Sequence, residues 1–173
     1  MNLTDALFAA ITNGKSPDDD LRKTVQALGG TKAVAQILGK SQRQVQRYVA
    51  RDPRKRTTPP KEVADALRRT AYASPSVRRS LISKRRAARM RSRRKVVYVR
   101  GRVEAGPIVG GRDYKRVRVL DVPISGELMA QVLAAWQDGD DQGARDALEE
   151  AFGEEYVAGW EFGDVDNLDF DVW

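Results

Sequence analysis

The sequence contains no cysteine and no histidine among its 173 residues. Without cysteine the chain has neither a disulfide framework nor a thiolate nucleophile, and the two absences together exclude a Cys/His zinc site. They also exclude a Ser-His-Asp triad and any imidazole acid–base step. The acidic clusters are spread over separate predicted elements without convergent spacing. We therefore expect no metal site, no cofactor and no enzymatic centre.

Long apolar runs are also missing. No stretch approaches the roughly 18 apolar residues that indicate a membrane-spanning helix. Residues 1–30 lack the basic start and apolar run of a signal peptide. The absence of cysteine fits a reducing compartment. We expect a cytoplasmic protein that has no membrane partner.

Acidic residues are scarce in the first 100 residues, which hold 25 Lys and Arg against 7 Asp and Glu. Residues 101–173 reverse this balance, with 6 Lys and Arg against 17 Asp and Glu. The net charge of +7 therefore conceals one strongly basic and one strongly acidic half. A basic half indicates a polyanionic partner, most often nucleic acid.

Apolar periodicity and capping residues predict an α+β fold with two domains. An all-α DNA-binding domain at 1–94 carries a helix-turn-helix and an Arg-rich helix, and a small acidic α+β domain follows at 95–173. Predicted helices are 2–13, 21–28, 32–38, 42–51, 61–71, 75–94, 125–137 and 140–152. Predicted strands are 95–103 and 115–124, joined by a turn over 106–114, and a third strand in which Leu168, Phe170 and Val172 alternate with acids.

Residues 31–50 have the spacing of a helix-turn-helix. Ala35 is small enough for two helices to pack closely, and Gly39, four residues later, tolerates a left-handed turn. Val45 then faces back from the second helix toward the first. Thr31 and Ser41 are placed to cap the two helices.

The outer face of the second predicted helix carries polar side chains that read base edges. Gln and Arg form paired hydrogen bonds with adenine and guanine. The alternative is an ordinary helical hairpin whose polar face meets water. We favour DNA binding through Thr31, Ser41, Gln42, Arg43, Gln44, Gln46 and Arg47.

A second basic surface is predicted from the proline-broken linker and the Arg-rich helix that follows it. No acid occurs between Ala71 and Arg102, which is unusual for a run that merely meets solvent, the alternative interpretation. Several phosphate contacts would make affinity fall steeply with salt. The residues expected to contact phosphates are Arg54, Lys55, Arg56, Arg78, Arg85, Arg86, Arg89, Arg93 and Arg94.

One known family shares this order of parts. The segment GTKAVAQILGKSQRQVQRYV (residues 30–49) resembles the helix-turn-helix of the actinobacterial telomere terminal proteins, which cap linear chromosomes and linear plasmids. The resemblance extends over most of Gly30–Trp173. It includes the basic linker, the Arg-rich helix, the glycine-turn β segment and a terminal pattern like that of residues 166–172.

The resemblance implies a protein that binds telomeric DNA and is joined through a side-chain hydroxyl to the 5′ end, where it primes end replication. A replication polymerase would catalyse this nucleotidyl transfer, so the chain would only donate the hydroxyl. The family's turn between the central strands carries threonine. Here Tyr114 is the only hydroxyl in that turn, and its alternative role is to anchor a strand. Thr57 and Thr58 are weaker candidates.

Three functions remain open at this point. The first is a terminal protein. Its partners would be telomeric or other duplex DNA, including single-stranded ends, and a polymerase or telomere-associated protein. It would be associated with the nucleoid or a plasmid. The second is a non-covalent regulator or partition protein of a mobile element, bound as a homodimer to half-sites about 10 bp apart. The third is an assembly protein that holds DNA without sequence preference.

Overall fold

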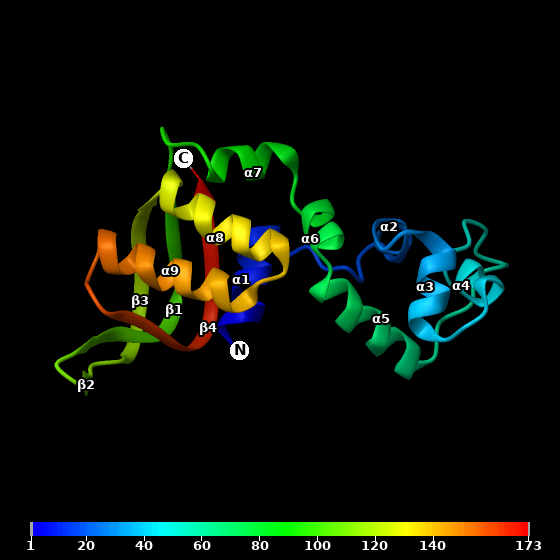
Figure 1. The fold of residues 1–173 in the computed structure, drawn as a ribbon, viewed down its shortest axis with the longest axis horizontal. Helices are drawn as coiled ribbons and strands as arrows, with labels where there is room; N and C mark the ends of the chain where they lie inside the picture. Colours follow the sequence, from blue (N-terminus) through cyan, green and yellow to red (C-terminus); the bar gives the residue numbers. More distant parts are fainter. Residues whose placement is uncertain (1, 173) are drawn as a thin grey trace. The chain divides into compact units, whose positions relative to one another are not determined.

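The computed structural model describes residues 2–172 of the chain and has the α+β fold that the sequence predicts. The chain forms two compact units (Figure 1). Ser16–Leu81 make up the first, called here the helical unit. The second, the sheet unit, combines the residues up to Lys15 with those from Ile82 onward.

The domain boundary expected at residue 94 lies elsewhere in the structure. The first helix, α1 (Leu3–Thr12), packs against the last strand of the sheet unit, and α7 (Lys84–Met90) packs against one of its helices. These segments carry apolar side chains that only the sheet unit buries, such as Leu7, Ile11 and Met90. Burial therefore assigns both segments to the sheet unit, although they are remote from it in sequence or in composition.

Five helices form the helical unit: α2 (Leu21–Ala27), α3 (Gly30–Leu38), α4 (Gln42–Tyr48), α5 (Lys61–Ala73) and α6 (Pro75–Leu81). One apolar cluster holds α2, α3, α4 and α5 together, and partly buried hydrophobic side chains such as Leu21 and Leu38 pack against it. The cluster consists of Val25, Val34, Ala35, Val45 and Leu67.

The sheet of the second unit is antiparallel and is centred on β1 (Val96–Val109). On one side β1 pairs with β3 (Arg116–Ser125), and on the other with β4 (Trp160–Val172). The two-residue strand β2 (Arg112–Asp113) folds back on the end of β1 through a glycine turn. β1 thus continues well beyond its predicted end at residue 103, into the predicted turn.

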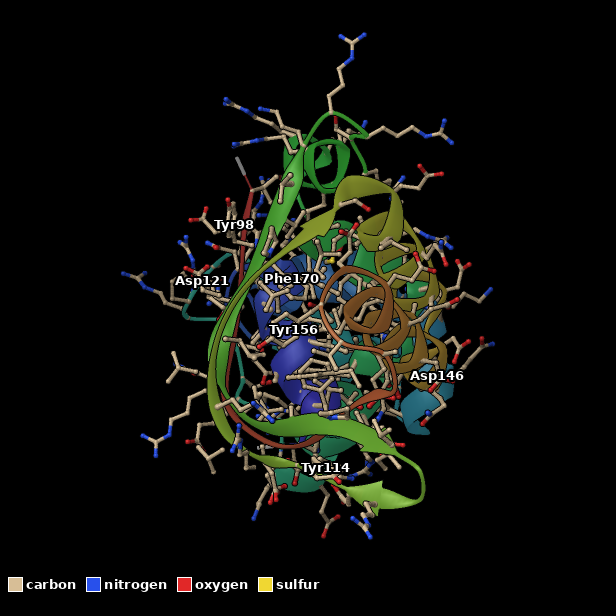
Figure 2. All side chains as sticks on the ribbon, turned by 90° about the vertical axis from the view of Figure 1, so that its left-hand side faces the viewer. Tyr98, Tyr114, Asp121, Asp146, Tyr156 and Phe170 are labelled. Atoms are coloured by element: carbon tan, nitrogen blue, oxygen red, sulfur yellow. The ribbon has the colours of Figure 1, made fainter. Side chains whose placement is uncertain are left out.

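Helices cover only one face of this sheet. α1, α8 (Gly126–Asp138) and α9 (Asp141–Glu155) lie on the side toward which Phe170 points, as Figure 2 shows. Phe152 of α9 stacks on Trp160 and meets Phe162 edge to face, with ring centroids 5.4 and 5.1 Å apart. Tyr98 and Asp121 project from the opposite face, which is called here the open face.

Gly101 lies in the central strand β1, between β3 and β4. It is paired with Leu120 on one side and Leu168 on the other. A Cβ atom at this position would overlap the backbone carbonyl of Asn167. The central strand therefore requires glycine here because the backbones of β1 and β4 approach too closely for any side chain.

The predicted helix over 75–94 is wrong in one respect: it is two helices. α6 ends at Leu81, and α7 begins after Ser83, whose hydroxyl accepts a hydrogen bond from the Arg86 backbone N–H at 3.1 Å. Ile82 is buried at the break. The N-cap at Ser83 thus starts a new helix where the sequence has no glycine or proline to announce a break. Among residues 2–172, no helix combines the length and the apolar character needed to cross a membrane.

Candidate nucleic-acid interface

The α3–turn–α4 segment has the turn and the core that its sequence predicts, but not the first cap. α3 begins at Gly30 with Gly29 as its N-cap, so Thr31 lies inside the helix and does not cap it. Gly39 adopts a left-handed conformation (φ 60°, ψ 34°), and the Lys40 N–H bonds to the Ala35 carbonyl at 2.9 Å to close the turn. Val34 and Val45 are almost completely buried between the two helices. This small core fixes α4 against α3 and leaves the other face of α4 in solvent.

A capping box begins α4. The Ser41 hydroxyl accepts from the Gln44 N–H at 3.2 Å, and the Gln44 side-chain oxygen accepts from the Ser41 N–H at 3.0 Å. These bonds commit the carbonyl oxygen of Gln44 and the hydroxyl of Ser41 to the helix end. Both residues were expected to contact DNA, and the structure gives them a role in folding α4.

Four exposed side chains form the outer face of α4: Gln42, Arg43, Gln46 and Arg47. The Gln42 amide donates to the Thr31 hydroxyl at 3.3 Å, which links the start of α4 to the start of α3. This bond holds the Gln42 amide nitrogen beside Thr31. The structure therefore places the four predicted DNA-contacting side chains on one exposed face of α4, and Thr31 lies beside that face.

The linker after α4 extends this face into a concave surface. The Arg56 guanidinium donates to the Ala50 carbonyl at 3.0 Å, and the Thr57 N–H donates to the Arg47 carbonyl at 3.2 Å. The linker thus folds back onto the end of α4 and encloses a pocket of about 500 Å³. Its lining contains four basic residues and no acidic one. The lining residues are Arg43, Gln46, Arg47, Ala50, Arg54, Lys55 and Thr57.

Two of these lining residues, Ala50 and Thr57, were not assigned to the predicted DNA surface. Their contribution depends on the linker folding back, and only the backbone bond between residues 47 and 57 reveals it. Arg56, by contrast, was expected at a phosphate and is used to fix the linker. The sequence signal that could have found the pocket is the pair of prolines that ends the linker.

Charge is concentrated in the helical unit. Residues 16–81 hold 15 Lys and Arg against 6 Asp and Glu, a net charge of +9. The sheet unit holds 16 against 18, because the basic segment 84–95 belongs to it. The division into a basic and an acidic half along the sequence thus becomes a basic helical unit and a nearly neutral sheet unit.

The Arg-rich run does not form one phosphate-binding surface. Arg78 is buried, with 2% of its surface exposed, and its Nε donates to the Tyr72 carbonyl at 2.6 Å. Arg86 donates to the carbonyls of Ala10, Ile11 and Phe170 at 2.9, 3.1 and 2.8 Å. Arg89 donates to the Val172 carbonyl at 2.5 Å. The assignment of Arg78 to a phosphate contact is wrong, because its side chain is buried. Arg86 is partly exposed and Arg89 is exposed, so their phosphate contacts stay predictions.

Burial has an electrostatic consequence at Arg86. Desolvation lowers the pKa of its guanidinium below the ordinary arginine value, and the nearby carboxylates of Asp169 and Asp171 oppose this shift. The charge is retained because three carbonyl oxygens and two carboxylates surround it. Arg86 therefore joins α1, α7 and β4 as a structural cation.

The remaining arginines of the run are exposed. Arg85 and Arg94 lie on the surface of the sheet unit, and Arg93 faces Glu127 at 3.3 Å in a solvent-exposed ion pair. Arg54 and Lys55 belong to the helical unit. The predicted basic surface is thus divided between the two units.

Tyr114 lies just after β2, at the connection to β3, with 49% of its surface exposed. Its backbone N–H donates to the Pro107 carbonyl at 3.1 Å, which holds the tyrosine at the base of the hairpin. Thr57 and Thr58 are exposed in the linker of the helical unit. Within residues 2–172 no group of acidic side chains is arranged to hold a metal ion.

The structure defines this chain as an α+β protein with a helix-turn-helix in a basic helical unit and a sheet unit that is open on one face. No protein-family model matches the chain, and comparisons with curated proteins and with solved structures find no significant match.

Proposed function

We propose that this protein binds duplex DNA and recognises its sequence through α4. The observation that carries the proposal is the continuous surface made by the outer face of α4 and the adjoining pocket, whose lining includes exposed Gln and Arg side chains and no acidic residue. Gln42, Arg43, Gln46 and Arg47 would read base edges in the major groove. Arg54 and Lys55 would contact the flanking phosphates.

The test compares matched and mismatched duplexes over a range of salt concentrations. Gln42→Ala and Arg43→Ala are expected to remove discrimination between them, by roughly 1–3 kcal/mol for each bidentate hydrogen-bond pair that the substitution removes. Arg54→Ala should instead weaken binding to all sequences and reduce the salt slope by about one. Arg22→Ala, an exposed arginine on α2, is the charge-matched control. Equal weakening of every sequence by Gln42→Ala would favour the assembly protein that holds DNA without sequence preference.

The finer proposal is that the DNA is the end of a linear replicon, as the resemblance to telomere terminal proteins implies. Binding assays with terminal and internal fragments of such a replicon test it. A preference for internal inverted repeats would favour a regulator or partition protein.

Covalent attachment would use Tyr114, whose exposed phenol lies on a projecting hairpin. The phenol oxygen would attack the α-phosphorus of a nucleoside triphosphate held by a polymerase and its Mg²⁺. Pyrophosphate would leave, and the phenolic proton would pass to solvent. Nuclease digestion of protein made with its DNA should leave a nucleotide on the peptide that contains Tyr114, and Tyr114→Phe should remove it. A digest without nucleotide-bearing peptide would exclude covalent priming.

A further inference from the structure

The two outer strands of the sheet differ in how their free edges are treated. β1 is paired on both sides, so among residues 2–172 β3 and β4 each have one edge without a neighbouring strand. An unpaired edge presents backbone N–H and C=O groups to any extended chain, and proteins commonly block it.

The edge of β4 is blocked by side chains. Arg86 and Arg89 donate to the carbonyls of Phe170 and Val172, and the Phe170 N–H donates to the Asp169 carboxylate at 2.8 Å. The backbone groups of Phe170 therefore point away from β1. Two arginines of α7 take the place that a further strand would occupy.

This orientation fixes which groups of β3 are free. Phe170 lies opposite Val99 and does not bond to it, so Val99 directs its N–H and C=O toward Val122 of β3. Alternation along the uninterrupted β1–β3 register then directs the backbone groups of Val117, Val119 and Asp121 outward. Pro123 follows, and its missing N–H ends the row of donors.

The same residues carry exposed apolar side chains. Val119 has 84% of its surface exposed and Val117 has 60%. Both project from the open face, as Asp121 does in Figure 2, and none of the described helices of the sheet unit covers that face. An edge with free backbone groups and exposed valines is the kind that associates with another strand.

We propose that β3 pairs antiparallel with β3 of a second copy of this chain, which joins two sheets into one continuous sheet. A two-fold axis through Arg118 would set Val117 opposite the partner's Val119, and Asp121 opposite the partner's Lys115. The apolar positions are thereby self-complementary, as an isologous interface requires. Within each copy Asp121 already pairs with Arg100, and Lys115 with Asp113 and Glu161, so the valines carry the proposed contact. The Arg118 guanidinium is already turned to the Ala105 carbonyl at 2.8 Å and lies over the Trp160 ring, so it leaves the axis free.

This dimer does not depend on the proposed DNA binding. It would, however, present two helical units to DNA, as the pairing of helix-turn-helix proteins on inverted repeats requires.

The experiment measures the mass of the full chain by analytical ultracentrifugation over a range of concentrations, without DNA. A monomer–dimer equilibrium is expected. Val119→Lys should raise the dissociation constant at least about tenfold, because it removes a valine from each copy and brings two ammonium groups together. Val109→Lys is the matched control, since Val109 is 56% exposed and lies at the far end of β1. It should leave the constant unchanged.

Hydrogen exchange provides a readout that does not depend on a variant folding. The amides of Val117, Val119 and Asp121 should exchange more slowly in concentrated than in dilute solution, while that of Tyr114 should not change. A chain that stays monomeric to its solubility limit would overturn the proposal. So would a dimer that Val119→Lys does not weaken, or a monomer whose β3 edge is protected only when an extended peptide of another protein is added.

Discussion

At the scale of single residues, Arg86 shows how long-range contacts decide what a charged side chain does. It belongs to a run of arginines whose composition indicates phosphate binding, yet its hydrogen-bond partners are carbonyls 75, 76 and 84 residues away along the chain. Nothing near Arg86 in the sequence distinguishes it from Arg85. Its role could not be predicted because both partner segments must first be brought together by the fold.

Arg86→Ala is expected to destabilise the sheet unit by about 3 kcal/mol, because it leaves three partly buried carbonyl groups without their donor. The free energy of unfolding from urea titration, followed by tryptophan fluorescence, measures the effect. Arg85→Ala is the neighbouring control and should change stability by less than about 0.5 kcal/mol, as exposed substitutions usually do. Equal effects of the two variants would show that Arg86 is not a structural cation.

Gly101 leads to a second residue-scale prediction. Gly101→Ala places a Cβ against the Asn167 carbonyl, so β1 and β4 must separate locally. We expect a loss of about 1–3 kcal/mol in the free energy of unfolding, the usual cost of overpacking. Gly110→Ala is the comparison: that turn glycine has no atom near the added Cβ and only its positive φ to oppose the change, so its cost should be smaller. Thermal unfolding of both variants, compared by midpoint, decides the order.

At the scale of elements, the helix-turn-helix could be predicted because its signals are local. Gly39, Ser41 and Val45 each act within a few residues, and the structure places them in the turn, the cap and the core as expected. The break between α6 and α7 was missed for the opposite reason. Ser83 caps α7 next to the buried Ile82, and Met90 at the other end of α7 is buried as well. Burial of this kind cannot be predicted from the local sequence.

The capping box makes a prediction about α4. Ser41→Ala removes the acceptor for the Gln44 N–H and should destabilise the helical unit by about 1 kcal/mol. Gln44→Glu should retain stability, because a glutamate can complete the same box. Far-ultraviolet circular dichroism during urea titration measures both. If Gln44→Glu is as unstable as Ser41→Ala, the side-chain oxygen of residue 44 is not the group that caps the helix.

At the scale of the whole molecule, the fold class could be predicted, but the division of the chain could not. Charge changes sign near residue 100, whereas the structure divides the chain at residues 15 and 81. Along the sequence, the helical unit lies between α1 and the rest of the sheet unit, and no feature of the composition indicates this order. α1 completes the sheet unit because Leu7 and Ile11 find their apolar neighbours there.

This division predicts two unfolding transitions that can be followed separately. All three tryptophans lie beyond residue 82, so tryptophan fluorescence reports the sheet unit, whereas circular dichroism at the helical minimum also reports the helical unit. Val45→Ala should destabilise the helical unit by about 1–3 kcal/mol, because it opens a cavity between α3 and α4. It should lower one transition by circular dichroism and leave the fluorescence midpoint unchanged, since Val45 contributes to the core of the helical unit alone. A fluorescence midpoint that falls together with the helical transition would mean that the chain unfolds as one cooperative body. In that case DNA bound at α4 would stabilise the sheet unit as well.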